Sequence, residues 1–233
     1  MDNNSLLVRK RYGNQLMDIR GFIRPNELFY YQNGRIKNAL TEALALGADC
    51  SIWCCWKWVT QNIQYPMGSP EVNDYHHQDA FPGNRPFALA NLLPAESATA
   101  FDFWEYPFEL LEPPMIGDCE ERAFLLCSML RNSLAAQDIC VAIGLWGTQP
   151  HAWVSLPREG TRYVLETTLL SIPSTPWQIP EQYPYHPIIY FNDESILPLE
   201  PIPDWLAGLT PAIRSSKKVA AIRLYYSTFS INP

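Results

Sequence analysis

The chain lacks a hydrophobic run long enough to cross a membrane. A transmembrane helix needs about 20 predominantly apolar residues, and no segment of the 233 residues has that character. At the start, MDNNSLLVRKRYG places two leucines and a valine before a basic cluster, which reverses the order of a secretion signal. We therefore expect no membrane partner, and the cytoplasm is the expected location.

Positive charge is also scarce. The chain has 17 Lys and Arg against 24 Asp and Glu, a net charge of -7, and its sequence pI is about 5.1. Nucleic-acid binding needs a basic face, and here the charges are dispersed without a long run of one sign. The composition argues against nucleic acid as the main partner.

Cysteines are few and unevenly placed. The six stand at positions 50, 54, 55, 119, 127 and 140, without the spacing of a disulfide framework, so without a secretion signal we expect them to be reduced. The first three lie among tryptophans, and no Cys-x-x-Cys pair or nearby histidine completes four metal ligands. We expect these three to be core residues.

No internal repeat or low-complexity tract interrupts the chain. With 47% hydrophobic and 13% aromatic residues it can bury a complete core. We expect an N-terminal arm over residues 1–35 and a single domain over 36–233. From about residue 171 to 233 this domain ends in a proline-rich extension, with one strand over 188–191.

Two helical patterns cover residues 38–46 and 50–63. Residues 66–100 are rich in proline and are predicted to be loops. Within them, DYHHQD at 74–79 allows two interpretations, a metal or substrate site or a solvated polar loop. Adjacent histidines lack the spacing that would place them on one face of a helix or strand, which favours the loop.

The most informative stretch is GDCEERAFLLCSMLR, where Cys119 falls at the start of a predicted helix. Asp118 stands at the N-cap position, and Glu121 follows three residues later, as in a capping box. The helix dipole favours the thiolate form of Cys119. The neighbouring Glu120 and Glu121 oppose it, so a reactive cysteine here needs a base. Apolar residues at helical spacing should anchor the helix in the core: Ala123, Phe124, Leu126, Cys127 and Leu130.

A β-hairpin downstream offers that base. Residues 151–156 alternate, so His151 and Trp153 share one face of a strand. If Glu159 and Gly160 form a two-residue turn, Trp153 lies opposite Glu166, and His151 is the diagonal neighbour of Glu166 on the same face. A loop longer or shorter by one residue would move Glu166 to the other face.

Side chains for a substrate cleft can be named only as candidates. FDFWEYPFELL at 101–111 is dense in aromatic residues and precedes the cysteine helix. Trp104 or Gln78 could supply an N–H group to an oxyanion, and Trp104, Trp146 and Trp153 could line the cleft. Spacing does not single out one of them.

The motifs GDCEERAFLLCSMLRN, HAWVSL and YVLETT, in this order, resemble the transglutaminase-like superfamily of papain-type cysteine enzymes. The segment CWKWVTQNIQYP also resembles the preceding helix of that family, so the likeness covers roughly residues 40–170. It implies an α+β fold with the cysteine helix packed on an antiparallel sheet. By motif, Cys119 would be the nucleophile, His151 the general base and acid, and Glu166 the orienting acid, where the family usually has aspartate.

Three functions follow from these motifs. A thiol hydrolase would cleave an amide bond of a peptide or protein through a thioester. A transglutaminase would pass the acyl group to an amine instead, if water is excluded. A non-catalytic binding domain could keep the fold. The intact Cys, His and acid favour an enzyme, and the short chain favours hydrolysis. The mechanism requires no metal or organic cofactor, and we expect none. The oligomeric state is open.

Overall fold

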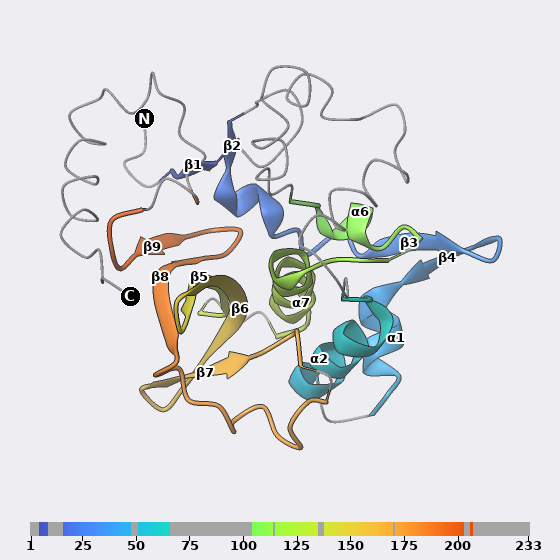
Figure 1. Ribbon diagram of the computed structural model, residues 1–233. Coiled ribbons are helices and arrows are strands. Elements are labelled where there is room, and N and C mark those ends of the chain that lie inside the picture. Colours follow the sequence, from blue (N-terminus) through green and yellow to red (C-terminus); the bar gives the residue numbers. More distant parts are fainter. Residues whose placement is uncertain are drawn as a thin grey trace.

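The computed structural model describes residues 5–8, 16–47, 51–65, 104–113, 115–134, 138–169, 171–202 and 206 (Figure 1). Gln78, the 74–79 segment and the end of the chain at 211–226, where the sequence fits helix or strand, lie outside these residues. No helix within the described ranges combines the length and apolar character needed to span a bilayer.

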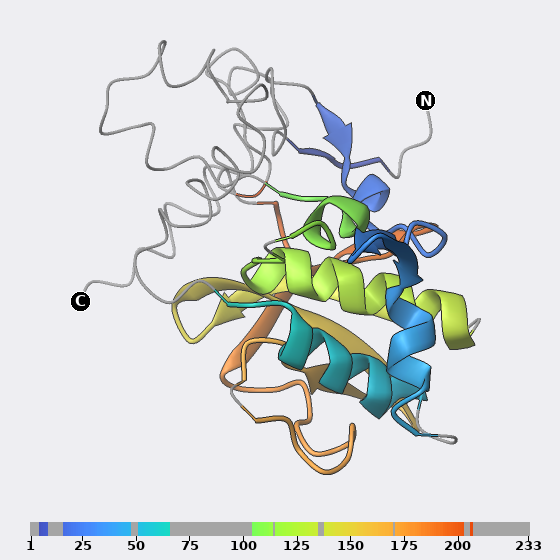
Figure 2. The same cartoon turned by 90° about the vertical axis from the view of Figure 1, so that its right-hand side faces the viewer.

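One long helix, α7 (Cys119–Leu134), runs through the middle of the fold. Viewed along this helix, the sheet lies on one side, and α1 (Ala39–Leu44) and α2 (Ser51–Asn62) lie on the other (Figure 1). The short helix α6 (Pro107–Leu110) lies near its N-terminal half (Figure 2). The cysteine helix is therefore the centre of the packing.

This position buries α7 more completely than its sequence indicates. The expected apolar face is buried, but so are Leu125 and Met129 on the opposite side, and so are Glu121, Arg122 and Ser128. The expectation of a single buried face is therefore too narrow. Because elements pack on both sides of the helix, its polar residues are drawn into the interior as well.

The sheet is entirely antiparallel and has the order β7-β6-β5-β8-β9. Together with the helices it confirms the α+β class. Its strands are β5 (Cys140–Trp146), β6 (Gln149–Arg158), β7 (Thr161–Leu165), β8 (Tyr185–Phe191) and β9 (Ile196–Pro198). The strand expected over 188–191 begins earlier, as β8, and β9 is an additional strand that the sequence analysis missed.

The β6–β7 hairpin has the predicted register. Arg158 pairs with Thr161, and Val154 pairs with Leu165. Glu159 and Gly160 have φ values of 52° and 79°, and a two-residue hairpin turn with both central residues at positive φ matches the twist of the strands. β7 ends at Leu165, so Glu166 follows directly after the strand.

The two faces of β6 differ as expected. Ala152, Val154 and Leu156 belong to the main core, whereas Trp153 belongs to a second, smaller cluster. The other buried members of that cluster are Cys140, Ala142, Val164, Tyr185 and Tyr190. The sheet therefore has a helix-covered face and an aromatic face.

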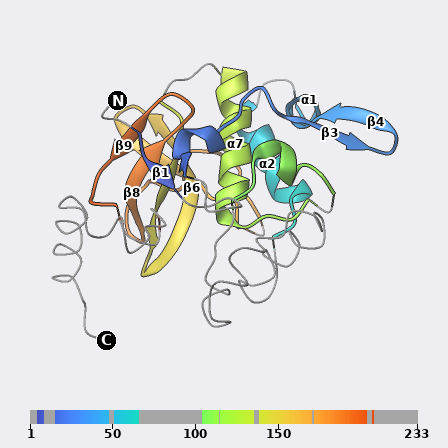
Figure 3. The same cartoon turned by 90° about the horizontal axis from the view of Figure 1, so that it is seen from above.

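Short elements precede α1 in the chain. They are β1 (Leu7–Val8), β2 (Met17–Asp18), the 3-10 helix η2 (Ile19–Phe22), β3 (Phe29–Gln32) and β4 (Arg35–Asn38) (Figure 3). Ile19 and Phe22 are fully buried in the main core. The division into an arm and a domain stays a prediction, but this part of the proposed arm contributes to the core.

Both helical patterns are present in shorter form. The Asn38 side chain accepts a hydrogen bond from the Thr41 N–H and caps α1. One expectation about the cysteines is wrong, because Cys54 in α2 is disulfide-bonded and its partner lies outside the described residues. Cys55, Cys119, Cys127 and Cys140 are free and buried.

Candidate active site

The N-terminus of α7 holds Cys119 in a defined position. Asp118 Oδ1 accepts a hydrogen bond from the Glu120 N–H at 3.2 Å, and Glu121 Oε2 accepts one from the Asp118 N–H at 3.1 Å. This is the predicted reciprocal cap, with Asp118 bonded one residue earlier than in the standard capping box. A Cβ at Gly117 would lie 2.6 Å from Leu110 Cδ1, so a larger residue here would force the Leu110 side chain of α6 to shift.

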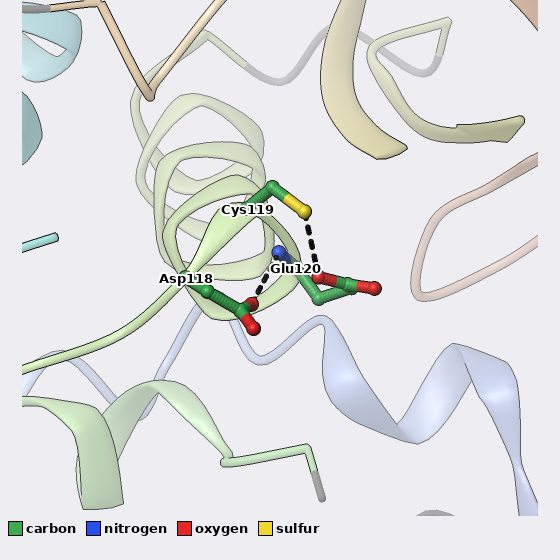
Figure 4. A group of neighbouring side chains, drawn as sticks. All are labelled: Asp118, Cys119 and Glu120. Carbon is green, nitrogen blue, oxygen red and sulfur yellow. Dashed lines mark hydrogen bonds between the residues drawn. The ribbon is translucent and has the colours of Figure 1, made fainter. Parts of the chain in front are cut away.

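The Cys119 thiol is enclosed by polar groups. Its Sγ donates to Glu120 Oε2 at 2.8 Å (Figure 4). Burial raises the pKa of this thiol well above the ordinary value, and the charges of Glu120 and Asp118 raise it further. A hydrogen bond from the Ala152 N–H acts in the opposite direction. In the resting structure, burial and the two acids outweigh the helix dipole.

His151 and Glu166 form a direct pair. His151 Nε2 lies 2.7 Å from Glu166 Oε2, and both side chains are largely buried. Tyr185 donates to Oε2 at 3.1 Å, and Thr168 donates to Oε1 through its N–H at 2.9 Å and its hydroxyl at 2.7 Å. Burial raises the pKa of Glu166, but the hydrogen bonds and charge from His151 and Thr168 outweigh it, so this pKa is lowered.

Strand β6 connects the surroundings of Cys119 with the His151–Glu166 pair. The Ala152 N–H that bonds the Cys119 sulfur belongs to the residue directly after His151. Because Glu166 occupies Nε2 of the imidazole, Nδ1 is the nitrogen left to accept a proton. The charges of both Cys119 and Glu166 act on Tyr65 and on Arg122, and the catalytic roles of Cys119, His151 and Glu166 stay predictions.

Comparison with known proteins gives only a faint likeness. The chain matches no protein-family model and no curated protein. Among solved structures, EGTA-treated LapG of Legionella pneumophila is 15% identical, with 80% of this chain and 95% of that chain covered and a TM-score of 0.34. Calcium-bound LapG of the same organism is 15% identical, with 81% and 97% covered and a TM-score of 0.33.

Two indole rings flank His151. The Trp153 ring stacks beside it, with centroids 6.1 Å apart and an interplanar angle of 29°, and the half-exposed Trp146 lies 6.5 Å away. The Trp153 N–H donates to Glu181, on the aromatic face of the sheet. Trp153 therefore packs against the imidazole, while its N–H is engaged away from Cys119.

Trp104 occupies a different environment. It is fully buried in the main core, 5.2 Å from the ring centroids of both Phe22 and Phe124. Gln78 lies outside the described residues. Neither residue is placed beside the Cys119 sulfur by a described contact, and their assignment as oxyanion donors stays a prediction.

Sequence reasoning missed several residues that support the acid. The Trp56 indole N–H donates to the Glu166 carbonyl oxygen at 2.9 Å, which anchors the chain after β7 to α2. Tyr185 reaches the Glu166 carboxylate from β8. The helical spacing of apolar residues over 50–63 indicates that Trp56 is buried, but neither contact leaves a local pattern in the sequence.

Asp118, Cys119 and Glu120 offer three ligand atoms that all lie within 4.8 Å of one another (Figure 4). Carboxylate oxygens suit hard cations such as Ca²⁺, and a thiolate suits Zn²⁺. A cation held by the two carboxylates would neutralise the charges that raise the pKa of the thiol.

Proposed function

We propose that this protein is a thiol hydrolase that cleaves an amide bond of a peptide or protein through a thioester intermediate. The observation that carries the proposal is the His151–Glu166 pair, 2.7 Å apart, next to the Ala152 N–H that bonds the Cys119 sulfur. A thiol, an imidazole that can accept its proton and a carboxylate bonded to that imidazole are the parts of an activated cysteine nucleophile.

In the acylation step, His151 Nδ1 takes the proton of Cys119 as the sulfur attacks the carbonyl carbon. Glu166 keeps the ring in the required tautomer and stabilises the imidazolium. The raised pKa of the thiol means that proton transfer accompanies attack, instead of preceding it as a stable ion pair. The tetrahedral intermediate collapses, the amine leaves with the proton from His151, and a thioester remains on Cys119.

Deacylation reverses the role of the imidazole. His151 removes a proton from water, which attacks the thioester carbon, and the carboxylic acid product leaves as the Cys119 sulfur is reprotonated. The side chain of His151 is 14% exposed, so solvent reaches the ring. An amine in place of water would give acyl transfer by the same steps.

The experiment measures acylation by p-nitrophenyl acetate together with cleavage of a mixed peptide library followed by mass spectrometry. We expect acetylation of Cys119, release of p-nitrophenolate and cleaved peptides, all lost in Cys119→Ser and reduced by about 100-fold or more in His151→Ala. Addition of glycine ethyl ester would reveal transfer to an amine. A folded protein whose Cys119 stays unacetylated would contradict the proposal.

A further inference from the structure

We propose that Tyr65 is a further catalytic residue, whose hydroxyl donates a hydrogen bond to the oxyanion formed when Cys119 attacks the substrate carbonyl. This inference rests on the proposed function, which does not identify the donor to the oxyanion. It was not among the candidates that the sequence suggested.

The backbone places Tyr65 beside the nucleophile. The preceding Gln64 N–H donates to the Met115 carbonyl at 2.8 Å, and the Gly117 N–H donates to the Gln64 carbonyl at 3.1 Å. These bonds form a parallel bridge between Gln64 and Ile116. Tyr65 therefore leaves α2 next to the short segment that leads into Cys119.

The Tyr65 phenol is a hydrogen-bond donor that no described residue engages. The side chain is half-buried, and its hydroxyl makes no hydrogen bond within the described part of the chain. Burial raises its pKa, and the nearby Cys119, Asp118, Glu120 and Glu166 raise it further. The phenol thus remains protonated over the working pH range and can donate to an anion.

Arg122 lies against the same ring. It follows Cys119 by three residues on α7, which places both on one side of the helix, and its guanidinium carbon lies 5.8 Å from the Tyr65 ring centroid. Arg122 is only 2% exposed, and its buried Nε has no hydrogen-bond partner among the residues that the structure describes. A cation over the ring face is attracted by the ring quadrupole, so Arg122 helps to hold Tyr65.

The electrostatics of the site require such donors. An oxyanion at Cys119 would form close to the Asp118 and Glu120 carboxylates, which oppose a further negative charge. The Tyr65 hydroxyl and the Arg122 charge act in the opposite direction. The Cys119 N–H, in the first turn of α7, has no intrahelical acceptor and can serve as a second donor.

The step balances without a further reactant. The sulfur–carbon bond forms, the carbonyl π pair moves to oxygen, and the thiol proton goes to His151. Tyr65 donates a hydrogen bond to that oxygen and keeps its own proton. When the carbonyl reforms, the leaving group departs with the proton from His151, and the hydrogen bond from Tyr65 weakens.

The test compares two reactions of Cys119 in Tyr65→Phe. Acylation by p-nitrophenyl acetate forms an oxyanion, whereas alkylation by iodoacetamide displaces iodide and forms none. Phenylalanine keeps the ring and its contact with Arg122. We expect acylation to slow by about 100-fold and alkylation to stay within twofold. The control is Tyr31→Phe, at a residue that is 57% exposed, with both rates unchanged.

Equal acylation rates in native protein and Tyr65→Phe would overturn this inference and leave the hydrolase proposal intact. A parallel loss of acylation and alkylation would also overturn it, since Tyr65 would then only shape the site. If native Cys119 is alkylated but never acylated, the proposed function fails, and the inference fails with it.

Discussion

At the residue scale, the groups around Cys119 favour the protonated form of its thiol. Burial raises its pKa, and the adjacent Glu120 both carries a negative charge and accepts the thiol hydrogen bond. We expect Glu120→Gln to lower the pKa, so that iodoacetamide alkylation accelerates severalfold at a fixed neutral pH. The exposed Glu112→Gln is the control. An unchanged pH profile of alkylation in Glu120→Gln would show that burial alone sets this pKa.

A cation should act on the same two carboxylates. Asp118 and Glu120 present oxygens close to the sulfur, and hard divalent cations prefer such ligands. We expect added Ca²⁺ to shift the alkylation profile of native protein to lower pH, because it neutralises both acids. The double variant Asp118→Asn with Glu120→Gln should not respond. A native profile insensitive to Ca²⁺ up to millimolar concentrations would argue against cation binding here.

The buried Glu166 predicts a specific dependence of stability on pH. Its pKa is lowered in the folded protein by His151 and Thr168, against the effect of burial. The ionised carboxylate therefore stabilises the fold above the unfolded pKa, near 4.5, and this contribution is lost as pH falls through the folded value. In urea titrations, native protein should lose stability more steeply than Glu166→Gln as the pH falls from about 5 to about 3. Parallel slopes would contradict this account.

At the scale of elements, α7 carries two arginines in different surroundings. Arg131 bonds Asp193 at 2.7 Å and Glu194 at 3.1 Å, whereas Arg122 has an unpartnered Nε. Burial lowers the pKa of Arg122 to about 10, despite the nearby charge of Glu166. Within the described part of the chain, one guanidinium nitrogen of Arg122 is thus left without a hydrogen bond, on the side of the candidate active site.

We expect Arg122→Met to raise the free energy of unfolding by on the order of 1 kcal/mol, because an apolar side chain of similar length avoids burying a charge. The same change should slow acylation of Cys119. Arg131→Met is the matched control on the same helix and should destabilise the protein by about 2 kcal/mol, since it breaks charged hydrogen bonds. Thermal and urea unfolding measure both, and a loss of stability in Arg122→Met would contradict the prediction.

The sequence predicts contacts between residues close together in the chain better than contacts between distant segments. The β6–β7 register follows from Glu159 and Gly160 alone, because turn geometry is local. The pairing of His151 with Glu166 follows from that register. Tyr185 and Arg122 were missed, because their contacts join segments whose approach is decided by the packing of the whole fold.

At the scale of the whole molecule, residues after position 170 form hydrogen bonds that support the candidate active site from the aromatic face of the sheet. Glu181 accepts hydrogen bonds from Trp153, Ser155 and Tyr190, and Trp153 in turn stacks on His151. Tyr185, from the same part of the chain, bonds Glu166. The proline-rich segment is therefore a structural support of the imidazole and its acid.

This arrangement predicts a distant effect of Glu181. In Glu181→Ala, the indole N–H and two hydroxyls lose their common acceptor, and unsatisfied groups of this kind cost about 1–3 kcal/mol each. We expect the free energy of unfolding to fall by about 2–3 kcal/mol, and acylation of Cys119 to slow about tenfold at temperatures where the variant stays folded, because Trp153 no longer fixes the imidazole. The exposed Glu200→Ala should change neither quantity. Normal acylation in a destabilised Glu181→Ala would show that the aromatic face supports the fold without orienting His151.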